Sequence, residues 1–220
     1  MVTEILAEFL AEFLVVFAAM DGGVILTFAG AALMLSLSPG TDMMFIIASG
    51  LSGDKRAAVM AVLGINAGVM THILLAAIGV AAVMAAHPKL VVVIQYAGGI
   101  YMVWLAVMSF RGAGDMAVRH GRSDPVAALR RGYVTNLLNP KVALFILALL
   151  PQFTNPEVGG IGGQILVLGA VLSAIGFSVS LAIGISAGAV STRLTRHKWR
   201  LDIAASIVFA AIAVRLFLPL

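Results

Sequence analysis

The sequence predicts an all-α membrane protein of six transmembrane helices, arranged as two inverted three-helix repeats with discontinuous first and fourth helices. Two observations indicate the class and a third indicates the repeat. Of the 220 residues, 61% are hydrophobic and 11% are charged, and the mean hydropathy is +1.08, whereas a soluble domain carries roughly 25% charged residues. Several apolar runs exceed the ~20 residues that cross a bilayer. Two of these runs are interrupted at a proline, at positions about half a chain apart.

Six stretches have the length and apolar character of spanning helices. They cover residues 24–48, 57–86, 90–110, about 126–150, 165–190 and 201–218. The separators contain polar or turn-forming residues, and they are Ser52 to Asp54, His87-Pro88, Arg111 to Pro125, Gly159 to Gly163 and Thr195 to Arg200. None could hold a soluble domain. We therefore expect one six-helix domain over residues 21–220, with repeats of about 21–119 and 120–220.

Lys and Arg are distributed unevenly among the loops, and short loops rich in these residues stay in the cytoplasm. The first, third and fifth loops contain eleven of the fourteen, namely Lys55, Arg56, Arg111, Arg119, Arg122, Arg130, Arg131, Arg193, Arg196, Lys198 and Arg200. The opposite side has Lys89; Lys141 and Arg215 lie within spans, and Arg215 is expected to snorkel to the outer surface. Both termini are thus predicted to face outward. The pI of about 9.9 reflects this topology and not a nucleic-acid surface.

Residues 1–20 form a separate acidic segment. Glu4, Glu8 and Glu12 recur every four residues among apolar neighbours, which makes one acidic stripe on an apolar helix. No basic region precedes it, so it does not resemble a signal peptide. An amphipathic helix on the outer surface is the prediction, with disorder or an upstream start codon before Met20 as alternatives.

The two interrupted spans carry the strongest functional signal. Residues Ser38 to Asp42 break the first span, and residues Asn139 to Lys141 break the fourth. Each pattern reads as an N-cap residue followed by proline at the first helical position, which starts a second half-helix inside the membrane. Paired breaks in corresponding positions of two halves are typical of secondary transporters. A packing kink is the alternative, and it explains one break better than two matched ones.

Three ionisable side chains lie at the breaks or deep in a span. Asp42 starts a half-helix, either as a proton or ammonium site or as a cap stabilised by the helix dipole. Lys141 also starts a half-helix, where a cation opposes that dipole, so it either binds substrate or snorkels. His72 shares a four-residue spacing with Gly64 and Gly68, which places all three on one close-packed face. Its role is a satisfied interhelical hydrogen bond or coupling.

These motifs resemble the LysE/RhtB superfamily of bacterial amino-acid exporters, in its homoserine/threonine-type branch, from about Met20 to the C-terminus. The matching stretches are Ser38-Pro39-Gly40-Thr41-Asp42 for the family's P-G-P-D, Gly64, Gly68 and His72 for its G-x3-G-x3-H-like helix, Ala97 to Tyr101, Arg131 to Lys141 (RGYVTNLLNPK), and Leu150 to Phe153 (LPQF). Thr41 replaces the family's second proline, and the acidic leader is a second departure.

The resemblance implies an inner-membrane exporter of amino acids or close analogues, energised by proton antiport. The candidate substrate-binding or coupling residues are Ser38, Pro39, Gly40, Thr41, Asp42, Asn66, His72, Asn136, Asn139, Pro140 and Lys141. The expected partners are a small-molecule amino acid, protons and membrane lipid, and a homodimer is compatible with this architecture. No cofactor, metal or nucleic acid is implied.

Three rival functions receive weaker support. A metal-ion or other small-solute exporter of the same superfamily is the main alternative, although a chain with no cysteine has few soft-metal ligands. An intramembrane serine protease would use Ser186, in the pattern Gly184-x-Ser186-x-Gly188, with His72 as its base; that pattern lies in what reads as an uninterrupted apolar helix and also fits helix packing. An ATP-driven pump is disfavoured because no Lys-Ser/Thr follows the glycine loop.

Overall fold

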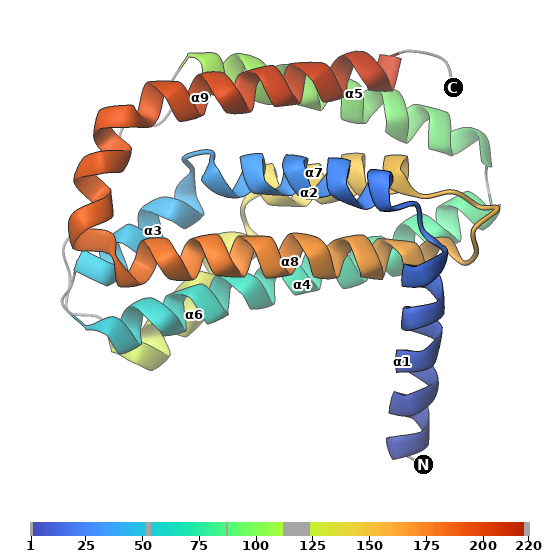
Figure 1. Cartoon of the computed structure of the whole chain (residues 1–220), viewed down its shortest axis with the longest axis horizontal. Helices are drawn as coiled ribbons and strands as arrows, with labels where there is room; N and C mark the ends of the chain where they lie inside the picture. The colour runs from blue at the N-terminus through green and yellow to red at the C-terminus, as the bar shows by residue number, and fades with distance from the viewer. Residues whose placement is uncertain (1, 52–53, 87, 112–123, 218–220) are drawn as a thin grey trace.

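The computed structural model describes residues 2–51, 54–86, 88–111 and 124–217, and throughout these ranges the regular structure is helical (Figure 1). The helices are α1 (Val2–Ala19), α2 (Gly22–Leu37), α3 (Thr41–Leu51), α4 (Lys55–Ala86), α5 (Pro88–Phe110), α6 (Pro125–Leu137), α7 (Pro140–Leu149), the 3-10 turn η1 (Leu150–Phe153), α8 (Ile161–Ile185) and α9 (Ala187–Phe217). The expected all-α class is confirmed for these residues.

The helices form three layers. Helices α2 and α7, one half of each interrupted span, lie in the middle layer. Helix α5 packs against α9 on one side, and α4 packs against α6 and α8 on the other. Helices α2 and α7 run between these layers, where α2 contacts α8 and α9, and α7 contacts α4 and α5 (Figure 1). Protein therefore packs on two sides of α2 and α7, and a membrane protein tolerates the backbone groups freed by a break where protein supplies partners for them.

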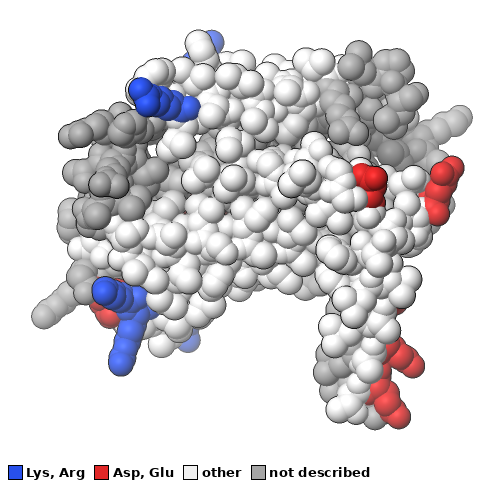
Figure 2. All heavy atoms as spheres, in the orientation of Figure 1, with Lys and Arg blue, Asp and Glu red and all other residues white. Residues whose placement is uncertain are grey.

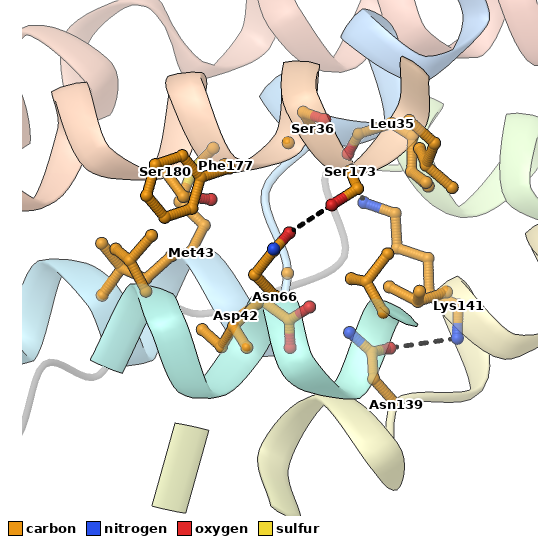
Figure 3. Close-up of a pocket in the computed structure, with 18 of the residues that line it drawn as sticks. Leu35, Ser36, Asp42, Met43, Asn66, Asn139, Lys141, Ser173, Phe177 and Ser180 are labelled. Carbon is orange, nitrogen blue, oxygen red and sulfur yellow. Dashed lines mark hydrogen bonds between the residues drawn. The ribbon is translucent and has the colours of Figure 1, made fainter. Parts of the chain in front are cut away.

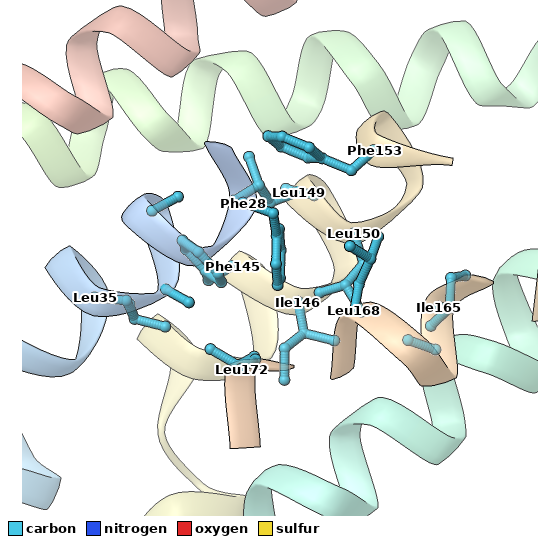
Figure 4. Close-up of a cluster of buried hydrophobic side chains, with 14 of the residues drawn as sticks. Phe28, Leu35, Phe145, Ile146, Leu149, Leu150, Phe153, Ile165, Leu168 and Leu172 are labelled. Carbon is cyan, nitrogen blue, oxygen red and sulfur yellow. The ribbon is translucent and has the colours of Figure 1, made fainter. Parts of the chain in front are cut away.

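A cluster of buried side chains fixes α2 and α7 against α8. Phe28 of α2 meets Phe153 edge to face, with ring centroids 5.4 Å apart, and Phe145, Leu149 and Leu168 are fully buried beside them (Figure 4). Close packing of this kind supplies dispersion contacts that lipid tails would otherwise make less completely. The cluster reaches Leu35 at the end of α2, so it sets the position of the first break.

Fewer of the described helices are long and apolar enough to cross a membrane than the six that the sequence predicts. Residues Lys55–Val80 and Ile161–Ile185 are long and apolar enough to cross a bilayer. Two bent pairs raise the number of spans to as many as four: Leu10–Ala19 with Gly22–Leu37, bent by 101°, and Pro125–Leu137 with Pro140–Phe153, bent by 52°. The chain is thus a helical membrane protein, while six crossings and inverted repeats stay predictions.

Two expected separators were wrong in their bounds. The stretch Thr195 to Arg200 lies inside α9, and the chain instead changes helix at Ser186. Polar residues do not interrupt a helix by themselves, because their side chains leave its backbone hydrogen bonds intact.

The glycine loop is also shorter than expected, since α8 begins at Ile161 and Gly159 makes the turn with φ of +141°, which favours glycine. Ser52, Gly53, His87 and residues 112–123 lie outside the described residues.

The acidic leader forms α1, which projects from the bundle (Figure 1). Its inner end rests on α8, where the side chain of Val16 lies against Gly163. The side chains of Glu4, Glu8 and Glu12 are exposed. Figure 2 shows blue Lys and Arg side chains toward the left of the bundle, with one red patch beside them at the lower left, whereas the other red Asp and Glu side chains lie toward the opposite end and along α1.

Candidate functional site

The first break separates α2 from α3, and Ser38 ends the first half-helix. The Ser38 N–H donates to the Met34 carbonyl as the C-cap of α2. Helix α3 starts at Thr41, and the Gly40 carbonyl accepts its first bond, from the Met44 N–H. The expectation that Ser38 caps the second half-helix was therefore wrong. Proline at position 39 cannot continue α2, and the chain needs two further residues before helical geometry resumes.

The second break follows the predicted pattern. Asn139 is the N-cap of α7, with its side-chain oxygen accepting a 3.0 Å bond from the Lys141 N–H, and Pro140 takes the first helical position. The carbonyl of Pro140 accepts a 3.3 Å hydrogen bond from the Tyr101 hydroxyl of α5. Asp42 and Lys141 consequently hold equivalent places, since each is the second residue of its half-helix.

Lys141 connects the two breaks. Its Nζ donates to the carbonyls of Ser38 at 2.9 Å and Leu35 at 3.4 Å, in the last turn of α2 and its cap. The C-terminal end of a helix carries unpaired carbonyls and partial negative charge, so a cation is stabilised there. The positive charge of Lys141 is thus unfavourable near the N-terminus of its own helix α7 and favourable at the C-terminus of α2.

Asp42 of α3 also connects the two breaks, through a contact with α6. Its Oδ2 accepts a 2.6 Å hydrogen bond from the side-chain Nδ2 of Asn136, in the last turn of α6. Its Oδ1 is buried and has no hydrogen-bond partner among the described residues. A buried carboxylate oxygen without a donor is costly, so this atom is suited to a proton or a ligand ammonium group.

The face of α4 that carries Gly64, Gly68 and His72 packs on α6, as predicted. A Cβ at Gly64 would overlap the Leu129 carbonyl, and one at Gly68 would lie 2.7 Å from the Asn136 Oδ1. His72 Nε2 lies 3.3 Å from the Asn136 carbonyl oxygen. Because a carbonyl only accepts, Nε2 is the donor in this bond. The three positions therefore hold Asn136 in place behind Asp42.

A cavity of about 730 Å³, counting its open mouth, lies where the breaks meet α4 and α8. Six of the predicted residues line it: Ser38, Gly40, Asp42, Asn66, Asn139 and Lys141. Figure 3 shows Asn66 hydrogen-bonded to Ser173 across the cavity, with Ser173 Oγ donating to Asn66 Oδ1 at 2.9 Å.

The other predicted residues are near this cavity without lining it. Asn136 and His72 form the support behind Asp42. Thr41 and Pro140 are exposed, and Pro39 is half-buried between the half-helices. The side chain of Arg215 lies outside the described part.

Helix α8 contributes residues that the sequence analysis missed. Ser173, Gly176, Phe177 and Ser180 all line the cavity. Their spacing of three, four and seven residues places them on one helix face, so two serines seven apart in an apolar helix were an available signal. Asp202 of α9 is a further polar residue that the sequence analysis missed, and it is buried, with 6% of its surface exposed.

The protease alternative finds no support in the site geometry. The expectation that Ser186 lies in an uninterrupted helix was wrong. Ser186 lies at the junction of α8 and α9, where its hydroxyl donates to the Ala182 carbonyl. The imidazole of His72 bonds to Asn136 instead. No cluster of three His, Cys, Asp or Glu side chains able to hold a metal occurs within the described residues.

Comparisons with known proteins give the family. Residues 33–219 match the family of LysE type translocators. An uncharacterized membrane protein of Vibrio cholerae is 35% identical, over 62% of this chain and 68% of its own length. The homoserine/homoserine lactone efflux protein of Salmonella typhimurium is 30% identical, over 62% of this chain and 66% of the relative. The leucine efflux protein of Klebsiella pneumoniae is 28% identical, over 87% of this chain and 93% of the relative.

No solved structure gives a significant match. The family match nevertheless covers well over half of the sequence and includes both breaks and the residues around the cavity. The chain belongs to the family of LysE type translocators.

Proposed function

We propose that this chain is a secondary active exporter of amino acids or close analogues across the bacterial inner membrane, driven by proton antiport. Relatives named as efflux proteins for homoserine and leucine support the export of amino acids. The observation that carries the proposal is that Asp42 and Lys141, from two different broken helices, line one cavity. A transporter of zwitterions needs one anionic and one cationic group at the same site.

The substrate carboxylate binds at the start of α7. The Lys141 ammonium group and the partial positive charge of the α7 N-terminus both favour an anion there. The substrate ammonium group binds Asp42, whose Oδ1 accepts no hydrogen bond from the described residues. Both charges of the amino acid are then matched inside the protein, which offsets the cost of removing them from water.

Coupling follows from competition at Asp42. A proton and a substrate ammonium group both need the Asp42 carboxylate, so the two ligands exclude one another. The binding site then carries the substrate outward and, with Asp42 protonated, carries a proton inward. The protein thereby exchanges a substrate molecule for a proton. Asn136 keeps the carboxylate in position in both states through its 2.6 Å hydrogen bond.

The membrane arrangement in this proposal has six crossings, inverted three-helix repeats and both termini outside. Equivalent placement of Asp42 and Lys141 in α3 and α7 supports the repeat. Concentration of Lys and Arg at one end of the bundle supports the orientation (Figure 2). Membrane lipid surrounds the outer helices, and a homodimer is compatible with this arrangement.

The experiment is transport by the purified protein in liposomes. Vesicles loaded with a panel of radiolabelled amino acids are diluted into buffer that imposes a proton gradient, with protein-free vesicles and vesicles given a protonophore as controls. We expect release of at least one amino acid that requires both protein and gradient. Release that continues unchanged with the protonophore would contradict antiport, and no release of any amino acid would contradict the substrate class.

A further inference from the structure

One end of the cavity has an apolar surface. Six lining residues belong to or pack on a single hydrophobic cluster between α3, α4 and α8: Met43, Ile46, Val62, Ile65, Phe177 and Ile183. We call this surface the apolar subsite. Figure 3 shows Met43 and Phe177 on the side of Asp42 opposite to Lys141 and Asn139. The charged groups and the apolar subsite therefore lie next to each other along one cavity.

The charges of the cavity leave no partner for a charged substrate side chain. Among its described lining residues, Asp42 and Lys141 are the ionisable ones. Every amino acid already carries one ammonium and one carboxylate group, which use both. A third charge would enter the apolar subsite without a counter-ion, and burying an unpaired charge is strongly unfavourable.

We propose that the site selects neutral amino acids with apolar side chains, and that the apolar subsite receives the side chain. This inference rests on the proposed function, because it assumes that the backbone groups of the substrate bind Asp42 and Lys141. Phe177 is the specificity-determining residue on α8, where it faces the cavity between Ser173 and Ser180 (Figure 3). Lysine, arginine, aspartate and glutamate are excluded because the lining has no third charged group to pair with their side chains.

Chain length of the substrate gives a quantitative expectation. Each methylene that enters an apolar site strengthens binding by about fourfold. Affinity should therefore rise by that factor at each step from alanine to 2-aminobutyrate, norvaline and norleucine. Lysine has the norleucine skeleton with one more ammonium group, so it isolates the effect of charge. We expect lysine to bind at least roughly a hundredfold more weakly than norleucine.

The experiment measures binding of this series to the purified protein in nanodiscs, by competition with a labelled amino acid that the protein transports. In Phe177→Ala the ratio of norleucine to alanine affinity should fall by about fourfold or more. Phe110→Ala is the matched control, because Phe110 is 71% exposed on α5 and does not line the cavity. That control should keep the wild-type ratio. In Ser180→Asp, a carboxylate beside the apolar subsite should improve lysine relative to norleucine by at least about tenfold.

The outcomes separate this inference from the proposed function. Equal affinity for alanine, norleucine and lysine would overturn the apolar subsite while leaving amino-acid transport intact. Equal loss of alanine and norleucine binding in Phe177→Ala would place the side chain elsewhere, even if Ser180→Asp failed to fold. Failure of every amino acid to bind the folded wild type would instead overturn the proposed function, and this inference with it.

Discussion

The Nζ of Lys141, at the start of α7, donates a 2.9 Å hydrogen bond to the backbone carbonyl of Ser38, at the end of α2. Lys141, from the second break, thus caps the C-terminal end of α2, the helix that precedes the first break. A cation in this position stabilises the unpaired carbonyls of α2. The same ammonium group lines the cavity, so Lys141 can both brace the two breaks and bind an anion. The first prediction separates these roles.

Lys141→Met should weaken the binding of amino acids. Methionine keeps a flexible apolar chain of similar size and removes the charge. Loss of one charge-assisted hydrogen bond to the substrate carboxylate costs about 1.5–3 kcal/mol, or roughly tenfold to a hundredfold in affinity. The measurement is substrate binding to the purified protein in detergent or nanodiscs.

A carboxylate-blocked amide analogue is the control for that substitution. It should bind the wild type poorly, and its affinity should hardly change in the variant. Equal losses for acid and amide would mean that Lys141 acts through the α2 carbonyls alone. The melting temperature should fall whichever role Lys141 has, because two carbonyls lose a donor.

Asp42→Asn should abolish efflux driven by a proton gradient while the protein stays folded in the membrane. Asparagine keeps the shape, and its amide oxygen can still accept the hydrogen bond from Asn136. It cannot take up and release a proton. The measurement is efflux from vesicles with an imposed gradient, alongside membrane yield and a melting curve. Gradient-driven efflux at the wild-type rate would remove Asp42 from the coupling step.

The topology prediction concerns Arg119, Arg196 and Leu220, of which Arg119 and Leu220 lie outside the described residues. Arg119 and Arg196 should be cytoplasmic and Leu220 outside, because of the eleven-to-one loop bias in Lys and Arg. The chain has no cysteine, so a single introduced cysteine is the sole labelling site. Arg119→Cys should resist an impermeant thiol reagent in intact cells, and Glu157→Cys should react. The reverse pattern would invert the orientation.

The two breaks were predictable because their causes are local. A proline inside an apolar run removes a backbone donor and kinks or ends the helix at that point. The cap of the second break was equally local, since Asn139 bonds to the N–H of Lys141 two residues on. The spacing of Gly64, Gly68 and His72 was sufficient to predict a shared face for the same reason.

The remaining features depend on which helices become neighbours. Pro39 places the end of α2 at Ser38, but residues 38–42 do not show which cation meets the Ser38 carbonyl, because Lys141 comes from a distant segment. The continuation of α9 through its polar stretch likewise cannot be inferred from polarity. The lining residues of α8 were missed because a serine in an apolar helix commonly bonds to its own backbone, as Ser178 does to Ala174.

Gly68→Ala should impair transport by displacing Asn136. A Cβ at this position would lie 2.7 Å from the Asn136 Oδ1 and 2.8 Å from its Cβ. The Asn136 side chain is buried in the last turn of α6, so it cannot yield without moving away from Asp42. Overpacking of this kind typically costs about 1–3 kcal/mol, or about fivefold to 150-fold in the folding equilibrium. We expect a lower melting temperature and reduced gradient-driven efflux.

Gly79→Ala is the matched control, because it makes the same change in the same helix. A Cβ at Gly79 meets no atom within 4 Å, so the substitution adds only the helix-favouring effect of alanine. Its melting temperature should equal or exceed that of the wild type, with unchanged efflux. The comparison isolates the contact with Asn136 from the effect of replacing a glycine in α4. If Gly68→Ala matched Gly79→Ala in both measurements, the 2.6 Å bond from Asn136 to Asp42 would not depend on the close approach of α4 to α6.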